Sequence, residues 1–275
     1  MLPRAWVALV ALALASSGAA PAATGWATHS ITRHIGSLDA SVSYQINDAP
    51  FPAFRNVRLT VRREGRAIID REVKCPIGRN QAIWCEPQAL TLPQLDTSSA
   101  PDVVLDLFTG GAHCCSVSVL VLTGQNPPRV ITHEWGDPGY KLQRYHGREY
   151  FVTGDDRFAY AFNSFAGSWF PSQTWAIDSS GQLANVTRTR PDLVARDAQN
   201  AWYFVKRGDG LGIVAGWCAD EYTLGLGRRC EAYLTEQLRH GTLRTCKGCG
   251  TSEWPDGKGF IALLHKRLLA WGYER

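Results

Sequence analysis

Apolar and polar residues alternate along much of the chain between residues 40 and 122. The alternation is clearest at residues 42–46, 57–61 and 117–121. Because successive side chains of a strand point to opposite faces, a period of two predicts half-buried antiparallel strands. Residues 103–108 are instead almost continuously apolar, which predicts a central strand that is buried on both faces.

Turn residues separate these runs. The sequence Arg-Glu-Gly-Arg at 63–66 joins the run at 57–61 to an apolar run at 67–73, so we expect a hairpin there. A second stretch rich in apolar residues and turns extends from residue 149 to residue 177. The strands expected within it are 150–152, 159–162 and 174–177.

The apolar period becomes helical after about residue 186. Thr189 and Asp192 have the spacing of a capping box, which predicts a helix that continues to Val205. Two more helices are expected at 213–224 and 228–239, and an apolar stripe from 260 to 271 predicts a last one. Strands that precede helices in this way favour an α+β fold. We expect a β-rich, antiparallel domain at 23–185 and a helical C-terminal region at 186–275 packed on it.

The composition narrows the class of protein. Hydrophobic residues make up 45% of the 275 residues and charged residues 20%, which excludes a disordered chain and a polytopic membrane protein. The formal net charge of +4 is too small to indicate a nucleic-acid partner, and we expect none.

The first residues show the order of charged, apolar and small-residue segments that is typical of a secretory signal peptide. Arg4 precedes an apolar run at 5–15, and small residues follow at 16–20. The apolar run has about half of the roughly 20 residues that a membrane-spanning helix needs. We therefore expect a signal peptide at 1–22, no transmembrane segment in the mature chain, and a secreted or periplasmic location.

Eight cysteines in an exported chain predict disulfides. Cys75 and Cys85 enclose a loop with Pro, Gly and Asn, and a local bridge is expected between them. Cys218 and Cys230 lie on consecutive expected helices and would link them. Another local disulfide is expected within Cys-Lys-Gly-Cys at 246–249, where half a zinc site and a redox pair are the alternatives. All eight are disulfide candidates: Cys75, Cys85, Cys114, Cys115, Cys218, Cys230, Cys246 and Cys249.

Cys114 and Cys115 are adjacent in the sequence. Their Cα atoms would lie about 3.8 Å apart across a trans peptide, which is less than the roughly 4.4 Å of an unstrained disulfide. A direct bond between them would therefore be strained, and the alternative is that one of them pairs with Cys75 or Cys85 while the other is buried or pairs elsewhere. A further alternative is a thiol nucleophile activated by His113, which is less favoured because neighbouring side chains on a strand point apart.

Two segments carry a resemblance to a known group. Residues 94–108 join an Asp-containing loop to the apolar strand, and Thr-Gly-Gly-Ala-His-Cys-Cys follows at 109–115. Gly-Asp-Pro-Gly-Tyr at 136–140 and Asp-Asp-Arg-Phe-Ala-Tyr-Ala-Phe at 155–162 form a second set. In these motifs the chain resembles exported bacterial proteins with FG-GAP/VCBS-like, integrin-alpha-like repeats, over roughly residues 42–205. The resemblance implies a propeller-blade-like β architecture in the N-terminal part and brings no assigned activity.

The resemblance also implies a calcium loop, from which this chain departs. The expected ligand positions hold Gln94, Asp96, Ser98 and Asp102, whereas calcium takes six to eight oxygen ligands. The corresponding loop of the second set, 143–149, is basic. We expect no cofactor, with calcium at Asp96 and Asp102 as the alternative.

The acidic turn within the second strand-rich stretch, and the aromatic residues after it, hold the candidate binding residues. They are Asp155, Asp156, Arg157 and Trp169, among several aromatic side chains that line a sugar platform or fill a core. We expect an exported, disulfide-stabilised, non-catalytic binding or interaction protein of the cell envelope or extracellular space, with a protein or glycan partner. The alternative is a secreted hydrolase in which Asp155 and Asp156 form an acid/base pair.

Overall fold

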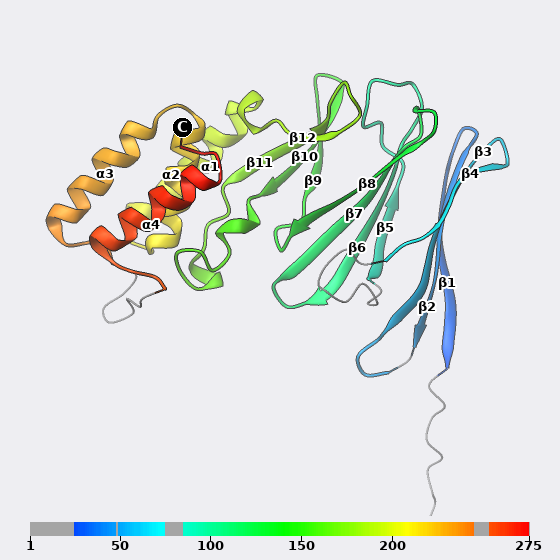
Figure 1. Cartoon of the computed structure of the whole chain (residues 1–275), viewed down its shortest axis with the longest axis horizontal. Helices are drawn as coiled ribbons and strands as arrows, with labels where there is room; N and C mark the ends of the chain where they lie inside the picture. The colour runs from blue at the N-terminus through cyan, green and yellow to red at the C-terminus, as the bar shows by residue number, and fades with distance from the viewer. Residues whose placement is uncertain (1–24, 48, 75–84, 245–252, 275) are drawn as a thin grey trace, which may run out of the picture.

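The computed structural model describes residues 25–47, 49–74, 85–244 and 253–274. In this part of the chain the strands form three sheets of four antiparallel strands each, followed by four helices (Figure 1). The α+β class expected from the sequence is confirmed. The predicted signal peptide at 1–22 lies outside the described residues.

The elements follow one another in the order of the sheets. The first sheet contains β1 (Trp26–Ile35), β2 (Leu38–Asn47), β3 (Phe54–Arg63) and β4 (Arg66–Glu72). The second contains β5 (Glu86–Thr91), β6 (Val103–Gly111), β7 (Cys114–Leu122) and β8 (Arg129–Gly136). The third contains β9 (Lys141–Tyr145), β10 (Arg148–Gly154), β11 (Ser172–Ile177) and β12 (Leu183–Asn185). The helices are α1 (Pro191–Val205), α2 (Leu211–Thr223), α3 (Gly227–His240) and α4 (Gly257–Ala270).

Each sheet is a meander in which strands adjacent in sequence are hydrogen-bonded neighbours. This is the strand order of a propeller blade. The three sheets stand in a row, with the helices beyond the third sheet (Figure 1). They do not close into a ring within the described residues, so the finer expectation of a propeller-like part stays a prediction.

Apolar side chains hold the sheets face to face. Val42 and Leu59 of the first sheet share a buried cluster with Leu105 of β6. On the opposite face of the second sheet, Val104 of β6 packs with Phe151 of the third. Strand β6 is therefore buried on both faces, as its apolar run predicted.

Local sequence signals explain the hairpin and its turn. Strands β3 and β4 pair in antiparallel register, and Glu64 and Gly65 between them have φ values of 52° and 77°. Two residues with positive φ form the turn that matches the twist of a hairpin. The predicted hairpin is confirmed.

The region after β10 differs from the prediction. Residues 159–162 were expected to form a strand, but a 3-10 helix (η1, Asp156–Phe158) and turns occupy this region. Phe158 and Phe162 are buried in the core of the helical part, where Phe158 lies 4.9 Å from Trp271 between ring centroids. The apolar residues of this segment therefore serve a helical core, which alternation alone does not distinguish from a sheet.

The predicted capping box is also wrong. The Thr189 hydroxyl donates to the carbonyl of Val186, and the Arg190 guanidinium forms an ion pair with Asp192 at 2.9 Å. Helix α1 begins at Pro191, whose missing N–H leaves one fewer donor to satisfy in the first turn.

The disulfides confirm one pairing and correct another. Cys218 and Cys230 join α2 to α3 with an S–S distance of 2.07 Å, as predicted. Cys114 and Cys115 are bonded to each other, so the expected pairing with Cys75 or Cys85 is wrong. The expectation assumed a trans peptide, whereas this peptide is cis and its Cα atoms lie 3.1 Å apart. Cys85 is disulfide-bonded.

The remaining cysteine predictions are not decided. Cys75, Cys246 and Cys249 lie outside the described residues, so their pairings stay predictions. Among the helices in the described residues, none combines the length and the apolar character needed to cross a membrane.

Candidate functional site

A cavity of about 880 Å³ opens where β8, the third sheet and the C-terminal segment meet. Strand β8 contributes His133 and Glu134, and strand β11 contributes Gln173 and Trp175. The acidic turn after β10 and the residues after α4 complete the wall. Three of the predicted binding residues, Asp155, Asp156 and Arg157, line this cavity.

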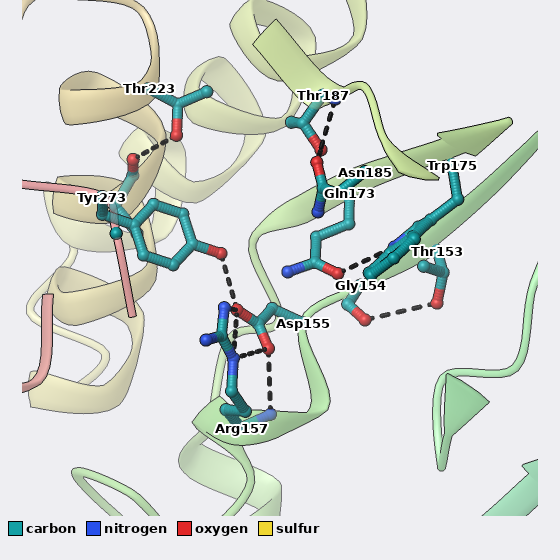
Figure 2. Close-up of polar contacts among 12 residues, drawn as sticks. Thr153, Gly154, Asp155, Arg157, Gln173, Trp175, Asn185, Thr187, Thr223 and Tyr273 are labelled. Carbon is teal, nitrogen blue, oxygen red and sulfur yellow. Dashed lines mark hydrogen bonds and ion pairs between the residues drawn. The ribbon is translucent and has the colours of Figure 1, made fainter. Parts of the chain in front are cut away.

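Asp155 connects the third sheet to the C-terminal segment. Its side chain is 3% exposed and accepts hydrogen bonds from Arg157 Nε at 2.8 Å and from the Tyr273 hydroxyl at 2.8 Å (Figure 2). The carboxylate also accepts from the backbone N–H of Arg157 and so caps the 3-10 helix η1. The oxygens of Asp155 are therefore held by groups of the protein itself.

The partners of Asp155 keep their protons. Burial and the neighbouring Asp155 carboxylate raise the pKa of Tyr273 well above its ordinary value, so its hydroxyl remains a donor. Burial opposes the charge of Arg157, but the hydrogen bond to Asp155 outweighs it and the pKa of Arg157 rises. The guanidinium lies over Trp271, 5.3 Å from the ring centroid. This group is a fixed, charge-balanced part of the wall.

Asp156 is arranged differently from its neighbour. Its carboxylate accepts the backbone N–H of Asp137 at 3.1 Å and lies against Gly136. A Cβ at Gly136 would lie 2.1 Å from Asp156 Cγ, and φ there is +69°, so this position requires glycine. Burial, followed by the charge of Asp137, raises the pKa of Asp156.

Glu134 is a second carboxylate on the same wall. Burial and the charge of Asp156 raise its pKa. Neither Glu134 nor Asp156 forms an ion pair with any residue that the structure describes. The cavity thus presents two carboxylates that form no ion pair among the described residues, in a lining that also contains Arg157 and Arg188.

The lining of the cavity also includes amides and an indole. Trp175 Nε1 donates to Gln173 Oε1 at 3.0 Å, which fixes both side chains (Figure 2). Residues 173 and 175 lie on the same face of β11, because alternate residues of a strand do. The oxygen of Asn185 accepts from the Thr187 hydroxyl at 2.7 Å. The side-chain oxygens of both amides are therefore engaged, and the Gln173 side chain also contacts the Tyr273 hydroxyl.

His133 adds a neutral ring to the lining of the cavity. It lies 4.7 Å from Trp175 between ring centroids. Burial lowers the pKa of His133, so the imidazole carries no charge at neutral pH.

The fourth predicted binding residue, Trp169, lies elsewhere. Its Nε1 donates to Asp197 on α1 at 3.2 Å, and its ring packs against Gly216 of α2. A Cβ at Gly216 would lie 2.7 Å from the Trp169 side chain. Trp169 thus anchors the loop before β11 to the helices and does not line the cavity.

The predicted calcium loop is held by internal hydrogen bonds. Asp102 is fully buried and accepts the backbone N–H groups of Leu95 at 2.9 Å and Thr123 at 3.0 Å. Burial raises the pKa of Asp102 to about 6. Asp96 accepts the N–H of Ser98 at 2.8 Å. Calcium binding at Asp96 and Asp102 stays a prediction.

The proposed thiol nucleophile is not assembled here. The sulfurs of Cys114 and Cys115 are bonded to each other, and the His113 ring packs on Phe165 with centroids 4.0 Å apart.

The sequence did not single out Glu134, Gln173 or Tyr273. Tyr273 is 118 residues from Asp155 along the chain, and no local pattern indicates that contact. Gln173 stands between a serine and a threonine, before the apolar residues of β11, and no local pattern distinguishes it.

Comparison with known proteins gives information on the cellular location. A probable thylakoid lumen protein of Synechocystis sp. (strain PCC 6803) is 34% identical over 122 residues, with 36% of this chain and 35% of that protein covered. The thylakoid lumen is topologically equivalent to the periplasm. The chain is an exported protein. This agrees with the predicted secreted or periplasmic location.

The match spans about a third of that protein's length. No family model matches the chain, and no solved structure matches it significantly.

Proposed function

We propose that the chain is a non-catalytic binding protein of the cell envelope or extracellular space, and that its cavity holds a glycan. The volume of about 880 Å³ lies within the range of roughly 300–1,000 Å³ that is typical of small-molecule sites. A cavity of this size accommodates a short oligosaccharide.

The observation that carries the proposal is the presence in one cavity of two carboxylates without an ion pair among the described residues, Glu134 and Asp156, together with side-chain amides. Carboxylate oxygens accept hydrogen bonds, and amide nitrogens donate them. A sugar hydroxyl does both, so a polyhydroxylated ligand can satisfy both kinds of group together. The Trp175 indole adds an apolar surface on which the face of a sugar ring can lie.

The state of Asp155 favours binding over hydrolysis. An acid/base pair needs a carboxyl group that exchanges a proton with the ligand. Asp155 is instead covered by Arg157 and the Tyr273 hydroxyl. Its role in this proposal is to hold the wall in place.

We also keep the resemblance to FG-GAP/VCBS-like repeat proteins as a proposal. Three successive four-stranded meanders support it, because each has the strand order of one blade.

A glycan array followed by calorimetry tests the proposed function. The oxidised mature protein is applied to printed bacterial and plant glycans, and an array hit is titrated into wild type and variants. Trp175→Ala and Gln173→Ala should each weaken binding at least about tenfold, which corresponds to about 1.4 kcal/mol. Tyr203→Ala is the matched control, because Tyr203 is 55% exposed on α1 and does not line the cavity.

The proposal fails if no glycan binds, or if a hit binds the Trp175 and Gln173 variants as it binds wild type. Binding of a cationic peptide in place of glycans would identify the carboxylate pair as a cation site and would also overturn it.

A further inference from the structure

Three metal-ligating side chains meet at the hairpin tip between β6 and β7. One sulfur each from Cys114 and Cys115 and a carboxylate oxygen of Glu134 all lie within 4.8 Å of one another. Glu134 comes from the neighbouring strand β8, so the sheet itself brings the three groups together. This arrangement is separate from the predicted calcium loop at Asp96 and Asp102.

The sequence motif at 109–115 builds this tip. The backbone N–H of Cys115 donates to the Thr109 hydroxyl at 2.8 Å. Gly110 has φ of +84°, and a Cβ at Gly111 would lie 2.7 Å from the carbonyl oxygen of Cys114. The Thr and both glycines are therefore required to place the two cysteines beside β8.

We propose that reduction of the Cys114–Cys115 disulfide opens a metal site in which both thiolates and the Glu134 carboxylate hold a zinc-like divalent cation. Zinc binds thiolate sulfur and carboxylate oxygen in tetrahedral sites, in which neighbouring ligand atoms are about 3.8 Å apart. The 4.8 Å limit places the Glu134 oxygen within reach of both sulfurs, and the two sulfurs move apart from bonding distance once the disulfide is reduced. Three protein ligands leave a fourth position for water or another ligand.

A dithiol can supply the electrons and protons that reduction of this disulfide requires. Thiol–disulfide exchange breaks the Cys114–Cys115 bond, and two electrons and two protons pass from the dithiol, which becomes a disulfide. Two thiols result. Each loses its proton as its sulfur binds the cation, so one bound cation releases two protons.

Accessibility should make this disulfide react before the Cys218–Cys230 disulfide. Cys114 is partly exposed at the hairpin tip, whereas Cys218 and Cys230 are both fully buried. Exchange requires a thiolate to reach a sulfur atom, so access controls the order of reduction. The Cys218–Cys230 disulfide therefore serves as an internal control.

The first measurement is the order of reduction. The oxidised protein is treated anaerobically with a limiting dithiol and alkylated, and its peptides are analysed by mass spectrometry. Cys114 and Cys115 should be alkylated while Cys218 and Cys230 remain linked. Opening of Cys218–Cys230 before Cys114–Cys115 would overturn the proposal.

The second measurement is metal binding. After the reductant is removed, Cd²⁺ is titrated as a spectroscopic substitute for zinc, and the thiolate-to-metal charge-transfer absorption is followed. Reduced wild type should bind Cd²⁺ at this site and the oxidised protein should not. The double variant Cys114→Ser/Cys115→Ser should lose the site, and Cys246→Ser/Cys249→Ser should retain it.

Glu134→Gln keeps the test decisive if the cysteine variant does not fold. Outer-shell partners of a metal already contribute about 10–100-fold in affinity, so loss of a ligand should weaken Cd²⁺ binding at least about tenfold. Glu64→Gln makes the same charge change on an exposed turn residue and should bind as wild type. Unchanged Cd²⁺ affinity in Glu134→Gln, or no Cd²⁺ bound by reduced wild type, would refute the site. Glycan binding is measured on the oxidised protein, so failure of either proposal is recognised independently.

Discussion

The substitution Tyr273→Phe removes a single hydroxyl from the contact that joins the third sheet to the C-terminal segment. The hydroxyl donates to the Asp155 carboxylate at 2.8 Å, and Tyr273 is 8% exposed. The phenylalanine ring keeps the edge contact with Phe158, whose centroid is 5.8 Å away. The change therefore isolates one hydrogen bond to a charged acceptor.

A hydrogen bond to a charged group contributes about 1.5–3 kcal/mol. Arg157 remains bonded to Asp155 in the variant, so we expect a loss near the lower end, about 2 kcal/mol. For a chain of this size the melting temperature should fall by about 4–8 °C. Because the pKa of Tyr273 is raised well above its ordinary value, the loss should not depend on pH near neutrality.

Urea denaturation and thermal melting of both proteins measure this loss. Tyr203→Phe is the matched control, since that hydroxyl accepts from Arg207 on an exposed surface and its removal should change stability by less than about 0.5 kcal/mol. Equal stability of the two variants would refute the assignment of Asp155 and Tyr273 as the link between sheet and helices.

Three further predictions concern buried acids and calcium. The pKa of Asp102 rises from 3.8 to about 6 on folding. Protonation of Asp102 therefore contributes about 3 kcal/mol to the stability of the folded protein below pH 4, and this contribution is lost as the pH rises through 6. Melting curves at both pH values should show this dependence in wild type and not in Asp102→Asn. Burial and the charge of Asp197 raise the pKa of the fully buried Asp220. The substitution Asp220→Asn should therefore stabilise the protein at neutral pH by at least about 1 kcal/mol, as measured by urea denaturation. Equal or lower stability of the variant would contradict this. Millimolar calcium should leave the melting temperature unchanged relative to chelator, because Asp102 already accepts backbone N–H groups, whereas a rise of about 5–10 °C would establish the calcium loop.

The features that the sequence predicted correctly depend on neighbouring residues. The turn at Glu64 and Gly65 and the doubly buried strand β6 were both recognised from local patterns. The disulfide between Cys218 and Cys230 was predicted because two helices joined by a short turn must pack side by side.

The features that the sequence missed depend on long-range packing. Phe158 and Phe162 alternate with other residues as strand residues do, but the helical core that buries them is formed more than thirty residues later in the chain. The Asp155–Tyr273 contact spans 118 residues. The acidic turn was predicted as a binding site because its residue types indicated one, while Glu134 and Gln173 joined it only through the fold.

The most direct test of the central claim is the position of a bound glycan in a crystal structure of the complex. The oxidised protein is crystallised with an array hit. We predict that the sugar lies in the cavity, with hydroxyls on Glu134 and Asp156 and one ring face on Trp175. A ligand located on another surface, with this cavity holding only water, would contradict the proposed function.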